Sequence, residues 1–145
     1  MKNTFRKSIC IVLALVCLLG LAACKKEVNA VEAKGLWKDA TYLEDMTFGE
    51  GKNTAIVEVK AGEQSVTFTV NTDEEMLGAA LLEHKLIDGD QGDYGLYIKK
   101  VNGITADYDT DKAYWGFYIN GEYATTGVDS TKIEKDATYK LEYTK

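Results

Sequence analysis

The sequence contains no proline and one histidine, and its three cysteines all lie within the first 24 of its 145 residues. Without proline, tight turns must depend on Gly, Asn and Asp, which tolerate the backbone angles that turns need. Because no cysteine follows Cys24, the remaining chain has no disulfide, and a domain there must be stabilised by its apolar core.

Motifs for catalysis are also lacking. The chain has no Gly-x-Ser-x-Gly elbow, no His-Glu-x-x-His helix and no phosphate-binding glycine loop. His84 lies near the end of a predicted helix, where capping or packing is the usual role. No cysteine after Cys24 is available as a nucleophile. We therefore expect a protein that is not an enzyme.

Residues 1–23 have the organisation of a secretory signal peptide. A basic start, an apolar core and small residues before a cysteine follow in order: Lys2, Arg6 and Lys7, then Ile9–Leu19, then Leu21-Ala22-Ala23-Cys24. The apolar core is too short to span a bilayer. The last four residues resemble a bacterial lipobox, which predicts a lipid on Cys24 that anchors the protein at the extracytoplasmic face of the cell membrane. The alternative is an ordinary secretory leader with an incidental cysteine.

Acidic residues outnumber basic ones, and the excess grows once the leader is removed. The chain has 17 basic and 23 acidic residues, and three of the basic ones lie in residues 1–23. The remaining 14 basic and 23 acidic residues give a net charge of −9. Such a protein gains nothing from the counterion release that drives nucleic-acid binding, so we expect no nucleic-acid partner.

The chain after the leader divides into three parts. Residues 24–35 are short and charged, and we expect a lipidated N-terminus and tether. Residues 36–53 are more apolar and include Trp37. They predict either an extra strand or arm that packs on the domain, or a partner-binding arm that uses Trp37. Residues 54–145 form the domain.

Within that domain the hydrophobic periodicity predicts an α+β fold with the order ββ-α-βββ. Alternating residues favour strands, and a stripe at helical spacing favours one helix. The expected elements are strands at 54–61 and 64–70, a helix at 73–84, and strands at 94–101, 114–119 and 137–144. Thr72 and Glu75 have the spacing of a capping box, and Gly78 should let the helix approach the sheet closely. We expect a small β-grasp-like sheet (ubiquitin-like or SLBB-like) of about five strands with one helix packed on it.

Two Asn-Gly pairs, Asn102-Gly103 and Asn120-Gly121, each follow an alternating run, which is the strongest short signal for a β-hairpin. The surrounding motifs resemble the DUF4430 family, which is similar to the C-terminal β domain of the vitamin B12 carriers intrinsic factor and transcobalamin. They are Gly95-Leu96-Tyr97-Ile98, Val101-Asn102-Gly103-Ile104, Tyr114-Trp115-Gly116-Phe117-Tyr118, Asn120-Gly121, Gly127-Val128 and Tyr139–Tyr143. The resemblance covers roughly residues 54–145, and more loosely the segment from Trp37.

The resemblance implies a small ligand-binding domain with cobalamin or another corrinoid as ligand, and ligand contacts near Tyr114, Trp115 and the Asn120-Gly121 hairpin. It also implies delivery to a membrane transporter or a second binding protein. The carriers hold B12 between this domain and a large α-helical domain, for which this sequence has no counterpart. We therefore expect weak binding by the lone domain, or a partner that supplies the other wall.

Alternation along the two central strands predicts which aromatic side chains are accessible. Trp115 should face the core, whereas Tyr97, Tyr114 and Tyr118 should face outward. These tyrosines are either a flat platform for a planar ligand, a sugar or a protein, or cross-strand pairs that stiffen the sheet. The alternative function is accordingly adhesion, as a protein- or glycan-interaction module at the cell surface.

One acidic loop has partial calcium-site spacing. Asp107, Asp109 and Asp111 match the first three ligand positions of an EF-hand loop. However, Lys112 and Tyr118 stand where that loop needs Gly and a bidentate Glu. The loop is either a solvated tip or a weak extracellular calcium site.

Overall fold

The computed structural model of the protein describes residues 27–145. The predicted signal peptide over residues 1–23 and the predicted lipid attachment at Cys24 lie outside this part of the chain. Within residues 27–145, no helix is long and apolar enough to cross a membrane.

The described residues are mainly β-structure with one main helix, so the predicted α+β class is confirmed. In chain order the elements are η1 (Gly35–Asp39), β1 (Met46–Phe48), β2 (Asn53–Ala61), β3 (Gln64–Thr72), α2 (Leu77–Glu83), β4 (Ile87–Gly92), β5 (Gly95–Val101), β6 (Ile104–Thr105), α3 (Tyr108–Asp111), β7 (Tyr114–Ile119), β8 (Glu122–Tyr123), η2 (Val128–Ser130) and β9 (Thr138–Thr144).

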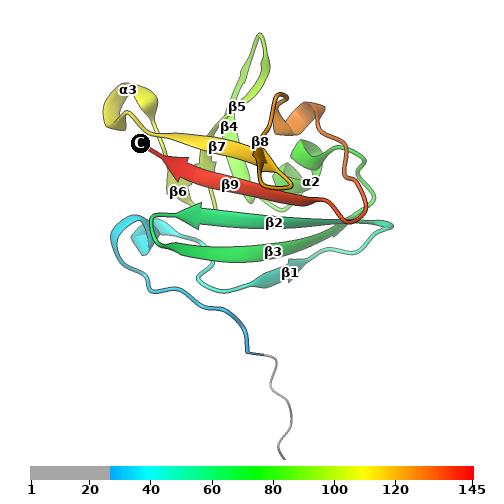
Figure 1. Cartoon of the computed structure of the whole chain (residues 1–145), viewed down its shortest axis with the longest axis horizontal. Helices are drawn as coiled ribbons and strands as arrows, with labels where there is room; N and C mark the ends of the chain where they lie inside the picture. The colour runs from blue at the N-terminus through cyan, green and yellow to red at the C-terminus, as the bar shows by residue number, and fades with distance from the viewer. Residues whose placement is uncertain (1–26) are drawn as a thin grey trace, which may run out of the picture.

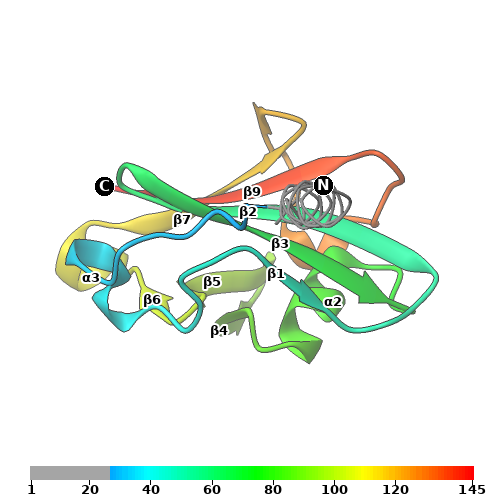
Figure 2. The same ribbon diagram turned by 90° about the horizontal axis from the view of Figure 1, so that it is seen from below.

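The strands form two layers. The larger sheet has the order β1-β3-β2-β9-β7-β8, and the smaller one has the order β4-β5-β6. Figures 1 and 2 show the larger sheet as one layer, with the smaller sheet and α2 on one side of it. The prediction of one sheet with about five strands is therefore wrong: residues 27–145 hold nine strands in two sheets. The main strand that the prediction omits is β4. Its residues Asp88–Gly92 contain no large apolar side chain, and they are extended because they pair with β5.

The core lies between the two layers, and the predicted alternation holds on β2, β3 and β9. On β5 it breaks: Ile98 and Val101 are both buried, because the pairing with β4 shifts register between Asp88 and Gly89. Inward residues of the larger sheet are buried: Val57, Val59, Val66, Phe68, Val70, Trp115, Phe117, Tyr139 and Leu141. They face buried residues of the other layer: Leu77, Leu81, Ile87, Ile98 and Val101. Both Asn-Gly pairs adopt positive φ at Asn and Gly and join adjacent antiparallel strands, as predicted.

Helix α2 is shorter than predicted, and the prediction of a capping box at Thr72 and Glu75 is wrong. The helix begins at Leu77 rather than at residue 73, and its N-cap makes no side-chain hydrogen bond. Thr72 is the last residue of β3, where pairing keeps it extended. Its hydroxyl accepts the backbone N–H of Glu74 at 3.1 Å and donates to Glu83 at 3.1 Å.

Gly78 brings α2 close to η2 rather than to a sheet. A Cβ at Gly78 would lie 2.8 Å from Cα of Asp129, a separation that no side chain can occupy. The neighbouring Leu77 N–H donates to the carbonyl of Thr131 at 2.8 Å. The expected close approach exists, but its partner is the backbone between β8 and β9.

Residues 36–53 pack on the domain, as the first of the two interpretations predicted. Trp37 is 1% exposed, and its Nε1–H donates to the carbonyl of Ala61 at 2.8 Å. Strand β1 adds a parallel edge strand to β3, with Met46 opposite Phe68. Trp37 is therefore unavailable to a partner, and the interpretation as a partner-binding arm through this residue is wrong.

The segment that was expected to be a tether is docked from Asn29 onward. Asn29 Nδ2 donates to the carbonyl of Ser65 at 2.9 Å. Asp45 Oδ1 accepts the backbone N–H of Thr67 at 2.7 Å. These two side chains form hydrogen bonds with backbone groups of β3 at Ser65 and Thr67, which precede the residues that pair with β1. The folded domain therefore starts near Asn29.

We predict that Asp45→Ala lowers the free energy of unfolding by roughly 1–3 kcal/mol, because it leaves the partly buried N–H of Thr67 without its acceptor. Urea denaturation followed by circular dichroism measures the change. Asp45→Asn keeps an oxygen in the same place and serves as the control, which should lose much less. Equal losses in both variants would contradict the assigned role of the acceptor.

Candidate functional site

The larger sheet leaves one face open to solvent, which we call the outer face. In Figure 2, no helix of the described residues lies over this face, and the β7–β8 hairpin projects from it. Alternation places Tyr114, Gly116 and Tyr118 of β7 on this side, because their neighbours Trp115 and Phe117 are buried in the core.

A hollow of about 370 Å³ lies beneath the β7–β8 hairpin, and we call it the hairpin hollow. Strands β2, β3 and β9 and the hairpin turn line it, with Ile56, Glu58, Thr67, Gly121, Thr138, Tyr139 and Lys140. Ile56 is 43% exposed, so the hollow offers an apolar floor surrounded by hydroxyl and charged groups. Such a mixture suits a ligand with both an apolar face and polar substituents.

The turn over this hollow is held to β9 by hydrogen bonds. Asn120 N–H donates to the carbonyl of Thr138 at 2.8 Å, and Asn120 Oδ1 accepts the N–H of Thr138 at 2.9 Å. Positive φ angles at Asn120 and Gly121 let the chain reverse in two residues. Asn120 therefore positions Gly121 over the hollow, and a ligand would meet the backbone of the turn.

Tyr118 lies beside the hollow in contact with three neighbours. Lys140 Nζ lies 4.2 Å from the centroid of its ring, within cation–π range. The ring of Tyr123 meets it edge to face, with centroids 5.3 Å apart. A Cβ at Gly116 would lie 3.2 Å from the Tyr118 ring. Because Gly116 has no side chain, the ring can lie against the sheet at this position. Tyr118 and Tyr123 are opposite each other on β7 and β8, so their contact is a cross-strand tyrosine pair beside Gly116.

Glu142 lies between two lysines on the outer face. Lys140 Nζ is 2.6 Å from Oε2, and Lys60 Nζ is 3.2 Å from Oε1. The hydrogen bond from Lys140 lowers the pKa of Glu142, the bond from Lys60 adds to this effect, and partial burial opposes it. The hydrogen bond to Glu142 in turn raises the pKa of Lys60. The outer face is therefore a charged and aromatic surface with fixed geometry.

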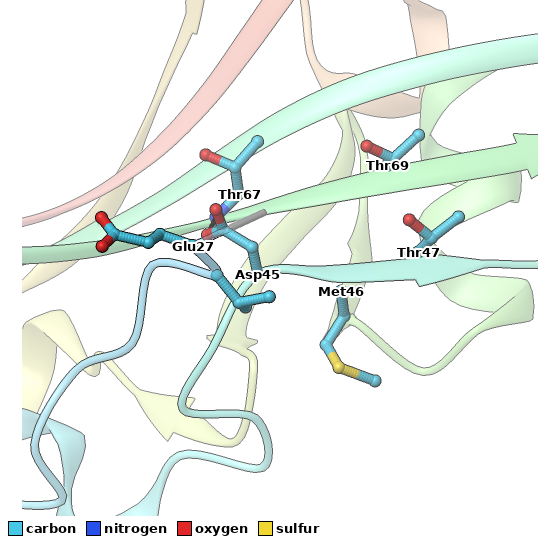
Figure 3. Close-up of a pocket in the computed structure, with 7 residues that line it drawn as sticks. Glu27, Asp45, Met46, Thr47, Thr67 and Thr69 are labelled. Carbon is cyan, nitrogen blue, oxygen red and sulfur yellow. Dashed lines mark hydrogen bonds between the residues drawn. The ribbon is translucent and has the colours of Figure 1, made fainter. Parts of the chain in front are cut away.

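A second hollow of about 270 Å³ lies at the β1 edge of the same face, and we call it the edge hollow. Figure 3 shows its residues, with Asp45 reaching from the chain before β1 towards Thr67 of β3. Five of the seven residues that line this hollow carry polar or charged side chains, and Val28 and Met46 add apolar surface. The full lining is Glu27, Val28, Asp45, Met46, Thr47, Thr67 and Thr69. Thr67 lines both hollows, so they are neighbours on one face.

The structure brings together only part of the predicted ligand-binding set. Tyr114, Tyr118, Asn120 and Gly121 belong to β7 and its hairpin on the larger sheet. Trp115 is 6% exposed and points to the core, where it meets Tyr143 edge to face. Tyr97 belongs to β5 of the smaller sheet, beyond the core, and therefore does not join the same stripe.

The acidic loop at Asp107, Asp109 and Asp111 forms the short helix α3. Asp107 is its N-cap, and its carboxylate accepts the N–H of Asp109 at 2.9 Å. Among residues 27–145, no group of three or more His, Cys, Asp or Glu side chains has an arrangement that could hold a metal ion.

Sequence reasoning did not identify Lys140, Glu142, Ile56 and Thr138 as site residues. Alternation on β2 and β9 places all four outward. The missing information was the strand order, since β9 lies between β2 and β7 only because it pairs in parallel with β2.

Comparison with known proteins places this geometry in a family. Residues 73–145 match the family model described as Domain of unknown function (DUF4430). A solved structure of a candidate metal-binding protein from Ruminococcus gnavus ATCC 29149 is 30% identical, with a TM-score of 0.61; the alignment covers 65% of this chain and 98% of that one. No curated protein sequence matches the chain.

The structure of haptocorrin in complex with Cbi (cobinamide) is also similar, with a TM-score of 0.52 and 16% identity. The alignment covers 68% of this chain but only 26% of haptocorrin. At this identity the likeness shows a shared fold, and the chain spans about a quarter of that protein's length.

We predict that Glu142→Gln lowers the melting temperature at neutral pH by a few degrees, because partly exposed ion pairs contribute up to about 1 kcal/mol. The pKa of Glu142 is lowered from 4.5 in the folded state. Its stabilising effect is therefore fully present above that value and is lost as the pH falls through the folded pKa.

The difference between the parent and Glu142→Gln should accordingly shrink below pH 4.5. Thermal unfolding at a series of pH values measures this, with Glu122→Gln on the exposed strand β8 as control. A difference that is independent of pH would rule out the assigned ion pairs.

Proposed function

Since the chain belongs to the DUF4430 family, we propose that it is a non-enzymatic binding protein, anchored by lipid on Cys24 at the extracytoplasmic face of the membrane. Its ligand is a corrinoid such as cobalamin or cobinamide, which it presents to an uptake system. Haptocorrin, whose structure contains Cbi, supports the choice of ligand through the shared fold.

The observation that carries this proposal is the hairpin hollow and its surroundings. Exposed Ile56 provides apolar area in the hollow, and Thr67, Thr138 and Lys140 add polar groups around it. The ring of Tyr118 stands beside the hollow, next to Lys140. A corrinoid has the matching chemistry, because its flat macrocycle carries amide side chains around its rim. Amides can accept hydrogen bonds from Lys140 and exchange them with the two threonine hydroxyls.

The hollow can cover only one side of such a ligand. Its volume of about 370 Å³ is at the low end of the roughly 300–1,000 Å³ that binding sites for small molecules occupy, and such sites bury most of the ligand surface. Binding by the lone domain should therefore be weak. High affinity requires a second wall, which a partner protein or the receiving transporter would supply.

An alternative function as a protein-interaction module is favoured by one specific feature. The β4–β5 hairpin projects beyond the body of the domain in Figure 1. Tyr94 at its tip is fully exposed, and Tyr97 is 45% exposed. Exposed tyrosines on a projecting hairpin are suited to insertion into a concave partner surface.

We predict saturable one-to-one binding when residues 25–145 are titrated with cobinamide in a calorimeter. Tyr118→Ala and Lys140→Ala should each weaken binding by about tenfold or more, since truncating an important contact residue costs more than about 1 kcal/mol. Tyr94→Ala, at the tip of the other sheet, is the matched control and should bind like the parent.

Circular dichroism of each variant must show that it still folds. Flat traces for the parent up to millimolar cobinamide would overturn the corrinoid ligand for the lone domain. Loss of cobinamide binding only in Tyr94→Ala would instead show that the binding site lies at the β4–β5 hairpin.

A further inference from the structure

The folded domain begins closer to the predicted lipid than the sequence indicates. Asn29 and Asp45 exchange hydrogen bonds, with Asp45 N–H donating to the carbonyl of Asn29 at 3.0 Å. Val31 N–H donates to the carbonyl of Leu43 at 2.7 Å. Within residues 27–145, Asn29 is the first residue that hydrogen bonds attach to the domain, whereas the sequence predicted a tether that extends to residue 35.

Only five residue steps separate Cys24 from Asn29. A fully extended chain covers at most about 3.6 Å per residue, so Asn29 stays within roughly 18 Å of the lipid-bearing residue. This upper limit depends only on covalent geometry. It is shorter than the width of a domain of this size, whose radius of gyration is about 13 Å.

This short connection determines which parts of the domain can be near the membrane. The edge hollow lies at the point of attachment, because Glu27 and Val28 line it themselves. The β4–β5 hairpin points the other way: in Figure 1 the N-terminal segment leaves from the lower side of the domain and this hairpin rises from the upper side. Tyr94 lies in its turn, between the end of β4 at Gly92 and the start of β5 at Gly95.

We propose that the edge hollow faces the membrane and docks onto the extracytoplasmic part of an integral membrane protein in the same membrane. This inference rests on the lipid anchor of the proposed function and adds the face that meets the partner. Because Thr67 belongs to both hollows, a partner seated on the edge hollow also reaches the rim of the ligand site and can supply its second wall.

The chemistry of the edge hollow favours a protein as occupant over the lipid surface. Glu27 and Asp45 give it negative charge, and residues 24–145 carry a net charge of −9. An anionic bilayer repels such a surface. The hydroxyls of Thr47, Thr67 and Thr69 together with the carboxylates instead match a protein surface that presents basic and hydrogen-bonding side chains.

Energy transfer to the membrane tests the orientation. The full chain is produced with its own leader, so that Cys24 carries lipid and an introduced cysteine is the only free thiol. Thr47→Cys in the edge hollow and Tyr94→Cys at the hairpin tip are labelled with a donor dye. Each is reconstituted in phosphatidylcholine vesicles that contain headgroup-labelled acceptor lipid. We expect higher transfer from residue 47 than from residue 94.

A lengthened tether is the matched control. Twelve Gly and Ser residues inserted between Lys26 and Glu27 add about 20 Å of root-mean-square reach. Transfer from residue 47 should then fall towards the value at residue 94. Failure of the parent to remain on vesicles would overturn the lipid anchor together with the orientation. Retention on vesicles with equal transfer from both sites would overturn the orientation alone.

Photo-cross-linking in intact bacteria tests the occupant. A photoreactive residue at Thr47 should form an adduct with a protein that has membrane-spanning segments, and the yield of the adduct should fall when the tether is lengthened, because the effective concentration of the domain at its partner falls. The same residue at Tyr94 should not form it. The absence of an adduct from residue 47, or an adduct that forms only from Tyr94, would overturn the edge hollow as the docking surface.

Discussion

Side chains of the larger sheet alternate between a covered face and an open face. This alternation determines which residues form the core and which form the outer face. The smaller sheet and α2 cover one face, so Trp115, Phe117, Tyr139 and Leu141 are committed to the core. Their immediate neighbours in sequence must then line the outer face. The side chains that a ligand could contact on this sheet are therefore those that the core does not use. Tyr118 and Lys140 meet there because β7 and β9 are paired.

The N-terminal arm completes the sheet in an unusual way for an edge. Three residues of β1 pair with β3, and beyond them Asn29 and Asp45 satisfy the backbone of β3 with side chains. An open edge would otherwise offer its N–H and C=O groups to other chains. The same contacts shorten the connection to Cys24, so one set of hydrogen bonds both protects the edge and fixes where the chain leaves the domain.

Sequence patterns predicted the elements whose conformation depends on neighbouring residues in the chain. Alternation located β2, β3, β5, β7 and β9, and the Asn-Gly pairs located two hairpin turns. Strand β4 was missed because its conformation depends on pairing with β5, and its own residues Asp88–Gly92 favour turns. The capping box failed because pairing with β2 holds Thr72 at the end of β3. Alternation predicts that Tyr97 and Tyr118 both face outward. It does not predict that β5 and β7 belong to different sheets, which only the tertiary structure shows.

The proposed ligand site, which covers one side of a ligand, and the proposed short lipid anchor would complement each other. A lone hollow buries little of a ligand, so its affinity is limited by the entropy of association. An anchor that confines the domain beside a membrane partner makes their meeting nearly intramolecular, with an effective concentration in the millimolar range for short linkers. Even a weak contact between the proposed partners would then be populated, and a ligand would be enclosed only where both walls are present. Capture and delivery would therefore be coupled by geometry, without any conformational change in the domain.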